Sequence, residues 1–256
     1  MKLLRAAGKY IAVLIFWLLV WELLALRVGS GLLLPGPAPV AGRTLELIVS
    51  ARFWRITGVS LARILCGVAA GVALGTVTAA LTARFAALRA LLSPLLTAVK
   101  ATPVASFIIL SLIWMGRDIV PGFIAFLMVL PMVWTNVSAG AAQTDPLLLE
   151  TARVFGFPAW KTCRLVYVPS CAPYFVSACR AALGLGWKAG IAAEILTVPR
   201  SSIGRMLYES KLYLETTDLF SWTLVVILCS LVIEKALMAA VGRLGGRWRA
   251  GHGGGQ

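Results

Sequence analysis

The sequence has few of the side chains that most enzyme active sites require. It contains one histidine, His252, and only ten acidic residues among 256 positions. No HExxH or GxSxG motif occurs, so the pattern indicates neither a zinc peptidase nor a serine hydrolase. The GxxxxGK(S/T) loop that binds nucleotide phosphates is missing too. We therefore expect a protein that is not an enzyme and binds no cofactor itself.

Cysteine is also scarce and forms no pattern of a metal or disulfide site. The chain has five cysteines, and none belongs to a CxxC pair. Structural zinc sites need closely spaced Cys or His ligands, and disulfide frameworks need regularly spaced cysteines. Most of these cysteines lie in apolar segments, where a small side chain packs well. We expect no bound metal and no disulfide.

Charged residues make up only 13% of the chain, whereas a soluble domain has about 25%. Hydrophobic residues make up 60%, and the mean hydropathy is +0.89. A membrane-spanning helix needs about 20 largely apolar residues. Six segments approach or exceed this length: 10–26, 57–83, 88–115, 119–140, 172–197 and 219–241. The predicted fold class is therefore all-α, a polytopic membrane protein with six transmembrane helices.

The net charge of +14 does not indicate a nucleic-acid-binding protein. The 24 basic residues are scattered over loops and helix ends, with no basic face interleaved with aromatic residues. In a membrane protein such residues orient the chain and contact anionic lipid headgroups. We expect membrane lipid as a partner, and no nucleic acid.

Basic residues at the start of the chain predict its orientation. Lys2, Arg5 and Lys9 precede the first apolar segment and place the N-terminus in the cytoplasm. That segment is longer than the apolar core of a signal peptide, so we expect it to be retained as a span. Six spans then leave both termini in the cytoplasm. We predict one domain, 1–256, with a first span at 10–26, core spans over 57–241 and a disordered Gly-rich tail at 250–256.

Two of the predicted spans have a distinctive glycine or proline pattern. Gly67, Gly71 and Gly75 repeat at four-residue spacing, which on a helix forms one flat stripe for close helix packing. The third span contains Pro94 and Pro103, which favour a kinked or interrupted helix.

The segment 144–169, between the fourth and fifth spans, is more polar than its surroundings. Asp145 is a good N-cap and is followed by proline, which suits the first helical position. Gly156 suits a left-handed C-cap, and Pro158 opens a second short helix that ends at Pro169. The sequence therefore predicts two short helices on the cytoplasmic side.

Two functions fit this helix pair. Leu148, Ala152 and Phe155 share one face of the first helix. In one interpretation this face covers the inner mouth of the helix bundle. In the other, it enters a cleft of a partner protein and buries its apolar side chains there.

The same segment resembles the cytoplasmic loop of ABC-importer permease subunits. Members of that family have Glu-Ala-Ala, three residues, Gly, nine residues and Ile-x-Leu-Pro. Here Glu150, Thr151 and Ala152 precede Gly156 at this spacing, and a Val-Tyr-Val run leads to Pro169. Thr151 replaces an alanine, and valines replace isoleucine and leucine. The resemblance implies that these residues, with Phe155, form the coupling loop on which an ATPase docks.

The resemblance covers nearly the whole chain and is strongest to the type I importer branch for sulfonates, taurine and nitrate. "LLLPGPAPV" is similar to a proline segment of that branch, and "SLARILCG" contains its Ser60, Leu61, Arg63 and Gly67 pattern. "AVKATPVASF" resembles its kinked third span, although Lys100 stands where an arginine is common. "GLGWKAGIAAEIL" resembles its fifth span, and "SIG" at 202–204 replaces a common Gly-Leu-Gly.

Membership of that family implies an assembly in a bacterial inner membrane. A second copy of the permease, two cytoplasmic ATPase subunits and an extracytoplasmic solute-binding protein are the implied partners. ATP and Mg²⁺ are used by the ATPase. The implied cargo is a small solute such as an organic sulfonate, a nitrate-like anion or a vitamin precursor.

Charged residues inside predicted spans are candidates for the translocation path. A charge at the bilayer centre is costly, so such residues face a bundle interior or a cavity. Lys100, Lys188 and Glu194 meet this criterion, and Pro103 and Trp187 are their motif neighbours. They line the path or brace helices across it; the sequence leaves both roles open. A different functional class, an ion-coupled carrier or channel without an ATPase, predicts internal symmetry or a row of acidic residues, and neither is visible.

Overall fold

The computed structural model describes the backbone of residues 2–250 and the side chains of residue 8 and residues 11–239. The predicted tail at 250–256, with His252, lies outside this part of the chain except for the backbone of residue 250. All regular structure in the described part is helical. In chain order the elements are α1 (Lys2–Val28), α2 (Pro37–Val49), α3 (Ala51–Arg84), α4 (Ala86–Ala101), α5 (Val104–Trp114), α6 (Val120–Ala142), α7 (Pro146–Val154), α8 (Ala159–Thr162), the π-helical turn η1 (Cys163–Tyr167), α9 (Val168–Thr197), α10 (Ile203–Leu212) and α11 (Thr216–Ala250).

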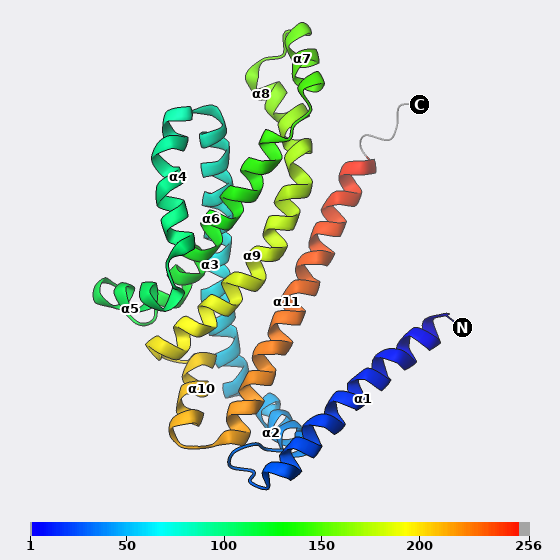
Figure 1. Ribbon diagram of the computed structural model, residues 1–256, viewed down its shortest axis with the longest axis vertical. Coiled ribbons are helices and arrows are strands. Elements are labelled where there is room, and N and C mark those ends of the chain that lie inside the picture. The colour runs from blue at the N-terminus through cyan, green and yellow to red at the C-terminus, as the bar shows by residue number, and fades with distance from the viewer. Residues whose placement is uncertain (1, 251–256) are drawn as a thin grey trace.

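Three long helices, α3, α6 and α9, form the centre of the molecule (Figure 1). Their core contains Ile64 and Val68 of α3, Val129 and Val133 of α6, and Ala182 of α9, all buried. Between helices solvated by lipid, such side chains stabilise the bundle through close van der Waals packing. A second buried cluster, around Ile108, Val120, Ile124, Met128, Ala189 and Ala193, joins α5 to α6 and α9.

The glycine stripe of α3 faces α6. A Cβ atom added to Gly67 would lie 2.0 Å from the backbone oxygen of Gly122, at the start of α6. At Gly71 it would lie 2.8 Å from a side-chain carbon of Val129, and at Gly75 it would lie 2.7 Å from the backbone oxygen of Leu130. Glycine at these positions allows the two backbones to approach to a distance that any side chain would prevent.

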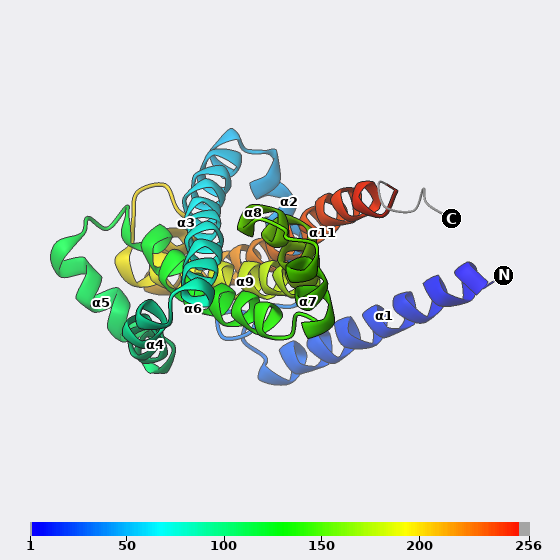
Figure 2. The ribbon, with the colours of Figure 1, turned by 90° about the horizontal axis from the view of Figure 1, so that it is seen from above.

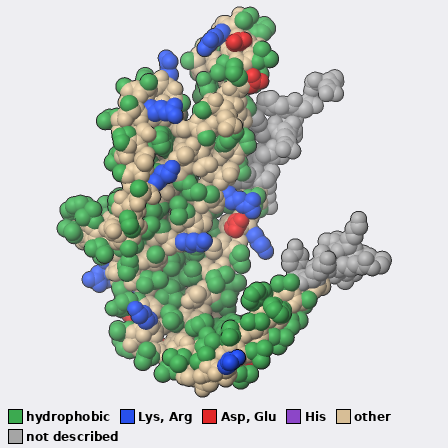
Figure 3. Space-filling model, viewed as in Figure 1, with side chains coloured by type: hydrophobic (Ala, Val, Ile, Leu, Met, Phe, Trp, Pro, Cys, Tyr) green, Lys and Arg blue, Asp and Glu red, His purple; other side chains and the backbone are tan. Residues whose placement is uncertain are grey.

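Four helices are long and apolar enough to cross a membrane: α3, α6 and the described parts of α1 and α11. Counting α4 and α5 together as one broken span gives five. The remaining predicted span, the fifth, is not among these: it falls in α9, which is 30 residues long but carries Arg180, Lys188 and Glu194. Apolar side chains are spread over the whole visible face, with few charged side chains between them (Figure 3), as expected for a chain that is solvated by lipid.

The predicted third span, 88–115, is two helices and not one. The axes of α4 and α5 differ by 107°. The break lies at Thr102, which is extended, and at Pro103, which has no N–H to continue the hydrogen bonds of α4. Pro94, by contrast, lies inside α4, so only one of the two prolines interrupts the span.

The predicted second short helix does not end at Pro169. α8 continues through η1 into α9, so the helix that contains the predicted fifth span begins at Val168, four residues before the predicted span start at 172. At the junction the N–H of Val168 donates to the carbonyl of Cys163, five residues back. Pro169 is the second residue of α9 and has no N–H to donate, and it lies directly after the π-helical turn, where the regular α-helical hydrogen-bond pattern is already interrupted.

α1 extends away from the other helices and lies near them only at its C-terminal end (Figures 1 and 2). There the indole N–H of Trp21 donates to the carbonyl of Pro35 at 3.0 Å, and the ring of Trp21 stacks on Phe220 with centroids 6.0 Å apart. The chain then forms α2, which packs on α11 at the same end as α10.

Candidate functional site

The helix pair α7–α8 is at the opposite end of the molecule from α2 and α10, where it projects beyond the neighbouring helix ends (Figure 1). Its local chemistry agrees with the predicted caps. The Asp145 carboxylate accepts a hydrogen bond of 2.9 Å from the N–H of Leu147. Gly156 has φ +63°, and the N–H groups of Gly156 and Phe157 donate to the carbonyls of Arg153 and Ala152. These bonds form a Schellman motif, which ends α7.

Apolar side chains of this helix pair point into solvent. The exposed fractions are 67% for Leu147, 84% for Val154, 72% for Phe155 and 65% for Trp160. We refer to these four residues as the tip patch. Protein surfaces seldom concentrate large exposed apolar side chains at one place unless a partner or a membrane covers them.

The three residues predicted to share one face of α7 separate in the structure. Ala152 is buried, with 3% of its surface exposed, whereas Leu148 and Phe155 are exposed. Glu150 and Thr151 are exposed too, and the hydroxyl of Thr151 donates to the carbonyl of Leu147. The motif residues therefore form an outward surface around a single buried alanine. Pro169 lies outside this surface, in the first turn of α9.

Lys100 and Pro103 lie on either side of the break between α4 and α5. The ammonium of Lys100, which is exposed, donates to the hydroxyl of Thr135 on α6 at 3.3 Å. Lys188 is exposed on α9, and among the described side chains no hydrogen bond or ion pair involves it. Its neighbour Ala189 belongs to the buried cluster that packs α5 on α9.

Trp187 and Glu194 are buried within the chain. The Trp187 indole donates to the carbonyl of Val226 on α11 at 3.2 Å. Glu194 is fully buried, and its carboxylate pairs with Arg63 at 2.9 Å. The five predicted path residues therefore do not form one cluster: two flank the break, two are packed in the core and Lys188 is exposed.

Sequence reasoning did not identify Arg63 and Ser60 as the partners of Glu194. Both occur in the "SLARILCG" segment, where they served only as motif positions. The hydroxyl of Ser60 donates to the Glu194 carboxylate at 2.8 Å. Arg63 and Glu194 are 131 positions apart, so no local pattern connects them.

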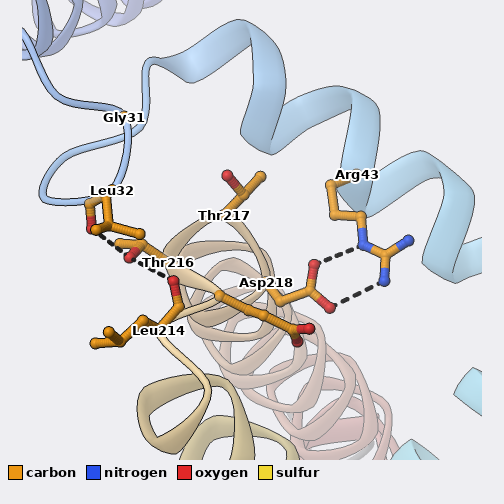
Figure 4. A pocket seen from close by; sticks show the side chains of 8 residues that line it. Gly31, Leu32, Arg43, Leu214, Thr216, Thr217 and Asp218 are labelled. Atoms are coloured by element: carbon orange, nitrogen blue, oxygen red, sulfur yellow. Dashed lines mark hydrogen bonds and ion pairs between the residues drawn. The ribbon is translucent and has the colours of Figure 1, made fainter.

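A hollow of 440 Å³ opens at the end of the molecule that contains α2 and α10, between the α1–α2 connection and the start of α11 (Figure 4). Beside it Arg43 forms two bonds with Asp218, at 2.6 and 2.9 Å, which tie α2 to α11. The hydrogen bonds that Arg43 donates to Asp218, and then to Glu46, raise the pKa of Arg43 above its already high value. Arg43 is therefore charged at every physiological pH.

Within the described residues no group of His, Cys, Asp or Glu side chains is placed to hold a metal ion.

Comparison with known proteins places this arrangement among transport components. The family model described as "Binding-protein-dependent transport system inner membrane component" matches residues 71–250. The taurine transport system permease protein TauC of Escherichia coli (strain K12) is 24% identical, with 93% of this chain and 87% of TauC covered. The putative aliphatic sulfonates transport permease protein SsuC of the same organism is 32% identical, with 84% of this chain and 81% of SsuC covered.

Two further comparisons extend this group. The riboflavin transport system permease protein RibX of Chloroflexus aurantiacus is 30% identical, with 85% of this chain and 81% of RibX covered. A solved structure described as an amino acid ABC transporter with histidines has a TM-score of 0.56 at 16% identity, with 75% of this chain and 91% of that chain covered. At that identity the structure shows a shared fold.

Proposed function

Because this chain belongs to the family of inner membrane components of binding-protein-dependent transport systems, we propose that it forms the translocation path of an ATP-driven importer. The chain is a non-catalytic, multi-pass permease of the inner membrane, and its system includes an ATPase and a binding protein. In our proposal a second copy of the chain completes the path, and the ATPase supplies the ATP and Mg²⁺ chemistry.

The observation that carries the proposal is the tip patch. Four large apolar side chains are more than half exposed on helices that project beyond the bundle. In an importer this patch is the surface on which the ATPase docks, and Glu150, Thr151, Ala152 and Gly156 give α7 its shape. Nucleotide-driven movement of the ATPase then pushes α7, and the uninterrupted helical path from α8 through η1 to α9 transmits the movement into the spans.

A charge reversal tests this docking. Glu150 is exposed, so Glu150→Lys leaves the fold of the permease intact. We expect it to reduce co-purification of the ATPase with the permease. Glu215→Lys, an equally exposed reversal at the outer end, is the matched control. The docking proposal is wrong if both variants retain the ATPase equally well.

The proposed topology has six spans and cytoplasmic termini. The spans are α1, α3, the broken pair α4–α5, α6, α9 and α11, with α7–α8 inside and α2 and α10 outside. The opposite positions of these two ends of the molecule support this arrangement. In a cysteine-free background, Tyr213→Cys should react with a membrane-impermeant maleimide added to whole cells, and Val154→Cys should react only after lysis. The reverse pattern would exclude this orientation.

The path residues have two proposed roles. Lys100 and Lys188, both exposed, face the path beside the break at Pro103, where cationic side chains favour an anionic solute. Trp187 and Glu194, which are buried and hydrogen-bonded, brace the helices behind them.

The relatives named for taurine, sulfonates and riboflavin support an organic sulfonate, a nitrate-like anion or a vitamin precursor as cargo. Identification of the solute retained by the system's binding protein tests this directly, and a cationic solute would contradict an anion path.

A further inference from the structure

Glu194 holds its carboxylate in the last turn of α9 with none of its surface exposed. One oxygen accepts from Arg63 at 2.9 Å. The other accepts from the hydroxyl of Ser60 at 2.8 Å and from the N–H of Gly204 at 3.1 Å. A buried carboxylate without such partners is strongly unfavourable, so this side chain requires α3 and α10 to stay at these positions.

The first residues of α10 are held by hydrogen bonds to this carboxylate and to the Ser60 hydroxyl beside it. The N–H of Ile203 donates to the Ser60 hydroxyl at 2.9 Å, next to the bond from Gly204. A Cβ atom on Gly204 would lie 2.3 Å from the Cβ atom of Glu194, so the first turn of α10 touches the last turn of α9. Only glycine permits this approach.

The chain reversal between α9 and α10 is strained. Val198 and Ser201 have φ of 47° and 48°, in the left-handed region that residues with a Cβ atom disfavour. Such conformations persist only where the surrounding structure holds them in place. The Glu194 contacts to both flanking helices supply this restraint.

Arg63 extends the same network to the outer surface. Its guanidinium lies 3.5 Å from the carbonyl of Arg200, in the reversal, and 3.8 Å from the carboxylate of Asp118, which precedes α6. Asp118 also accepts from the N–H of Arg200 at 2.8 Å. One guanidinium therefore links α3, the end of α9, the α9–α10 reversal and the connection that leads into α6.

We propose that Arg63 and Glu194 are positioning residues that fix α10 to α3 and α9, so that the outer end of the path moves as one unit. The proposal rests on the proposed importer function. When α9 is displaced from the cytoplasmic side through α7 and α8, this network carries the displacement to α10. Without this network, α10 separates from α9, and the binding protein at the outer face no longer stimulates the ATPase.

The test uses the complete complex of permease and ATPase in nanodiscs, with the system's own binding protein added or omitted. The variant Arg63→Met/Glu194→Met removes both charges together, because removal of one partner alone would leave a buried unpaired charge. The variant Arg63→Gln/Glu194→Gln keeps a neutral hydrogen-bonded link between the same helices. Gly204→Ala retains all charges and pushes α10 away from α9 by steric contact.

Two readouts separate positioning from folding. Hydrogen exchange reports the freedom of the α10 amides, and ATP hydrolysis reports how strongly the binding protein stimulates the complex. We expect the Met pair and Gly204→Ala to raise exchange in α10 at least about tenfold, and to lower the stimulation about 2- to 30-fold. We expect the Gln pair to retain both wild-type values within about twofold.

Normal stimulation in the Met pair and in Gly204→Ala would overturn the proposal, and so would lost stimulation in the Gln pair with α10 still protected. If the Met pair fails to assemble, Gly204→Ala decides, since it leaves no buried charge unpaired. A wild-type complex that shows no stimulation would instead contradict the proposed importer function, while α10 exchange would still report on the network.

Discussion

Truncation of Phe155 to alanine is the sharpest test of the tip patch. Phe155 is 72% exposed, so its removal should leave the stability of the isolated permease unchanged. A fully buried aromatic side chain removes about 150–250 Å² from water. With 72% of its surface free, Phe155 can bury about 110–180 Å² against a partner, or about 3–4.5 kcal/mol at 25 cal/mol per Å².

Part of this gain is offset, because alanine still buries some surface and binding orders the side chain. A loss of about 2–3 kcal/mol remains, which corresponds to about 30- to 150-fold weaker ATPase binding. The assay is titration of purified ATPase onto immobilised permease nanodiscs, with a thermal melt of the permease alone as the folding check.

The matched control is Tyr213→Ala, since Tyr213 is an aromatic residue that is 70% exposed and follows α10, at the opposite end of the molecule from α7. We expect it to bind the ATPase as the wild type does. The docking argument would be refuted if Phe155→Ala bound within about twofold of the wild type, or if Tyr213→Ala weakened binding equally.

Three further predictions address packing, charge and transport. Gly67→Ala places a Cβ atom 2.0 Å from a backbone oxygen of α6 and should lower the free energy of unfolding by about 1–3 kcal/mol or more. The control is Gly58→Ala in the same helix, where a Cβ atom would meet nothing within 4 Å. In a thermal melt this control should be neutral or slightly stabilising. The Arg43–Asp218 link should be insensitive to alkaline pH up to pH 10: the hydrogen bonds to Asp218 raise the pKa of Arg43 above that of a free arginine, so the contribution of the link is fully present below the free value and is lost only as pH rises through the raised pKa. A fall in melting temperature between pH 7 and pH 10 that Arg43→Gln abolishes would contradict this. Lys188→Met should reduce uptake while ATPase docking persists, and normal uptake would exclude Lys188 from the path.

Local chemistry made α7 predictable. An N-cap carboxylate, a proline at the first helical position and a glycine in the left-handed region act within a few residues of each other, so Asp145 and Gly156 mark the ends of the helix in sequence and structure alike. The apolar segments were predictable for a similar reason, because the length of a span reflects the thickness of the bilayer.

Proline predicted helix ends and breaks less reliably, because its effect depends on the packing around it, which the sequence does not show. Pro94 and Pro103 lie in the same predicted span, yet only Pro103 coincides with the 107° break. Pro169 was expected to end a helix, but it starts α9 after a π-helical turn. Whether a proline interrupts a helix depends on whether the backbone carbonyl that loses its N–H donor finds another hydrogen-bond partner.

The sequence by itself determined the all-helical membrane class, the spacing of the coupling motif and the caps of α7, because each depends on residues close together in the chain or on composition. Only the tertiary structure decided which side chains meet. It exposed Phe155 and buried Ala152 on one short helix, and it joined Glu194 to Arg63 across 131 positions. A buried charge signals that a partner must exist, but the partner's identity depends on how the helices pack.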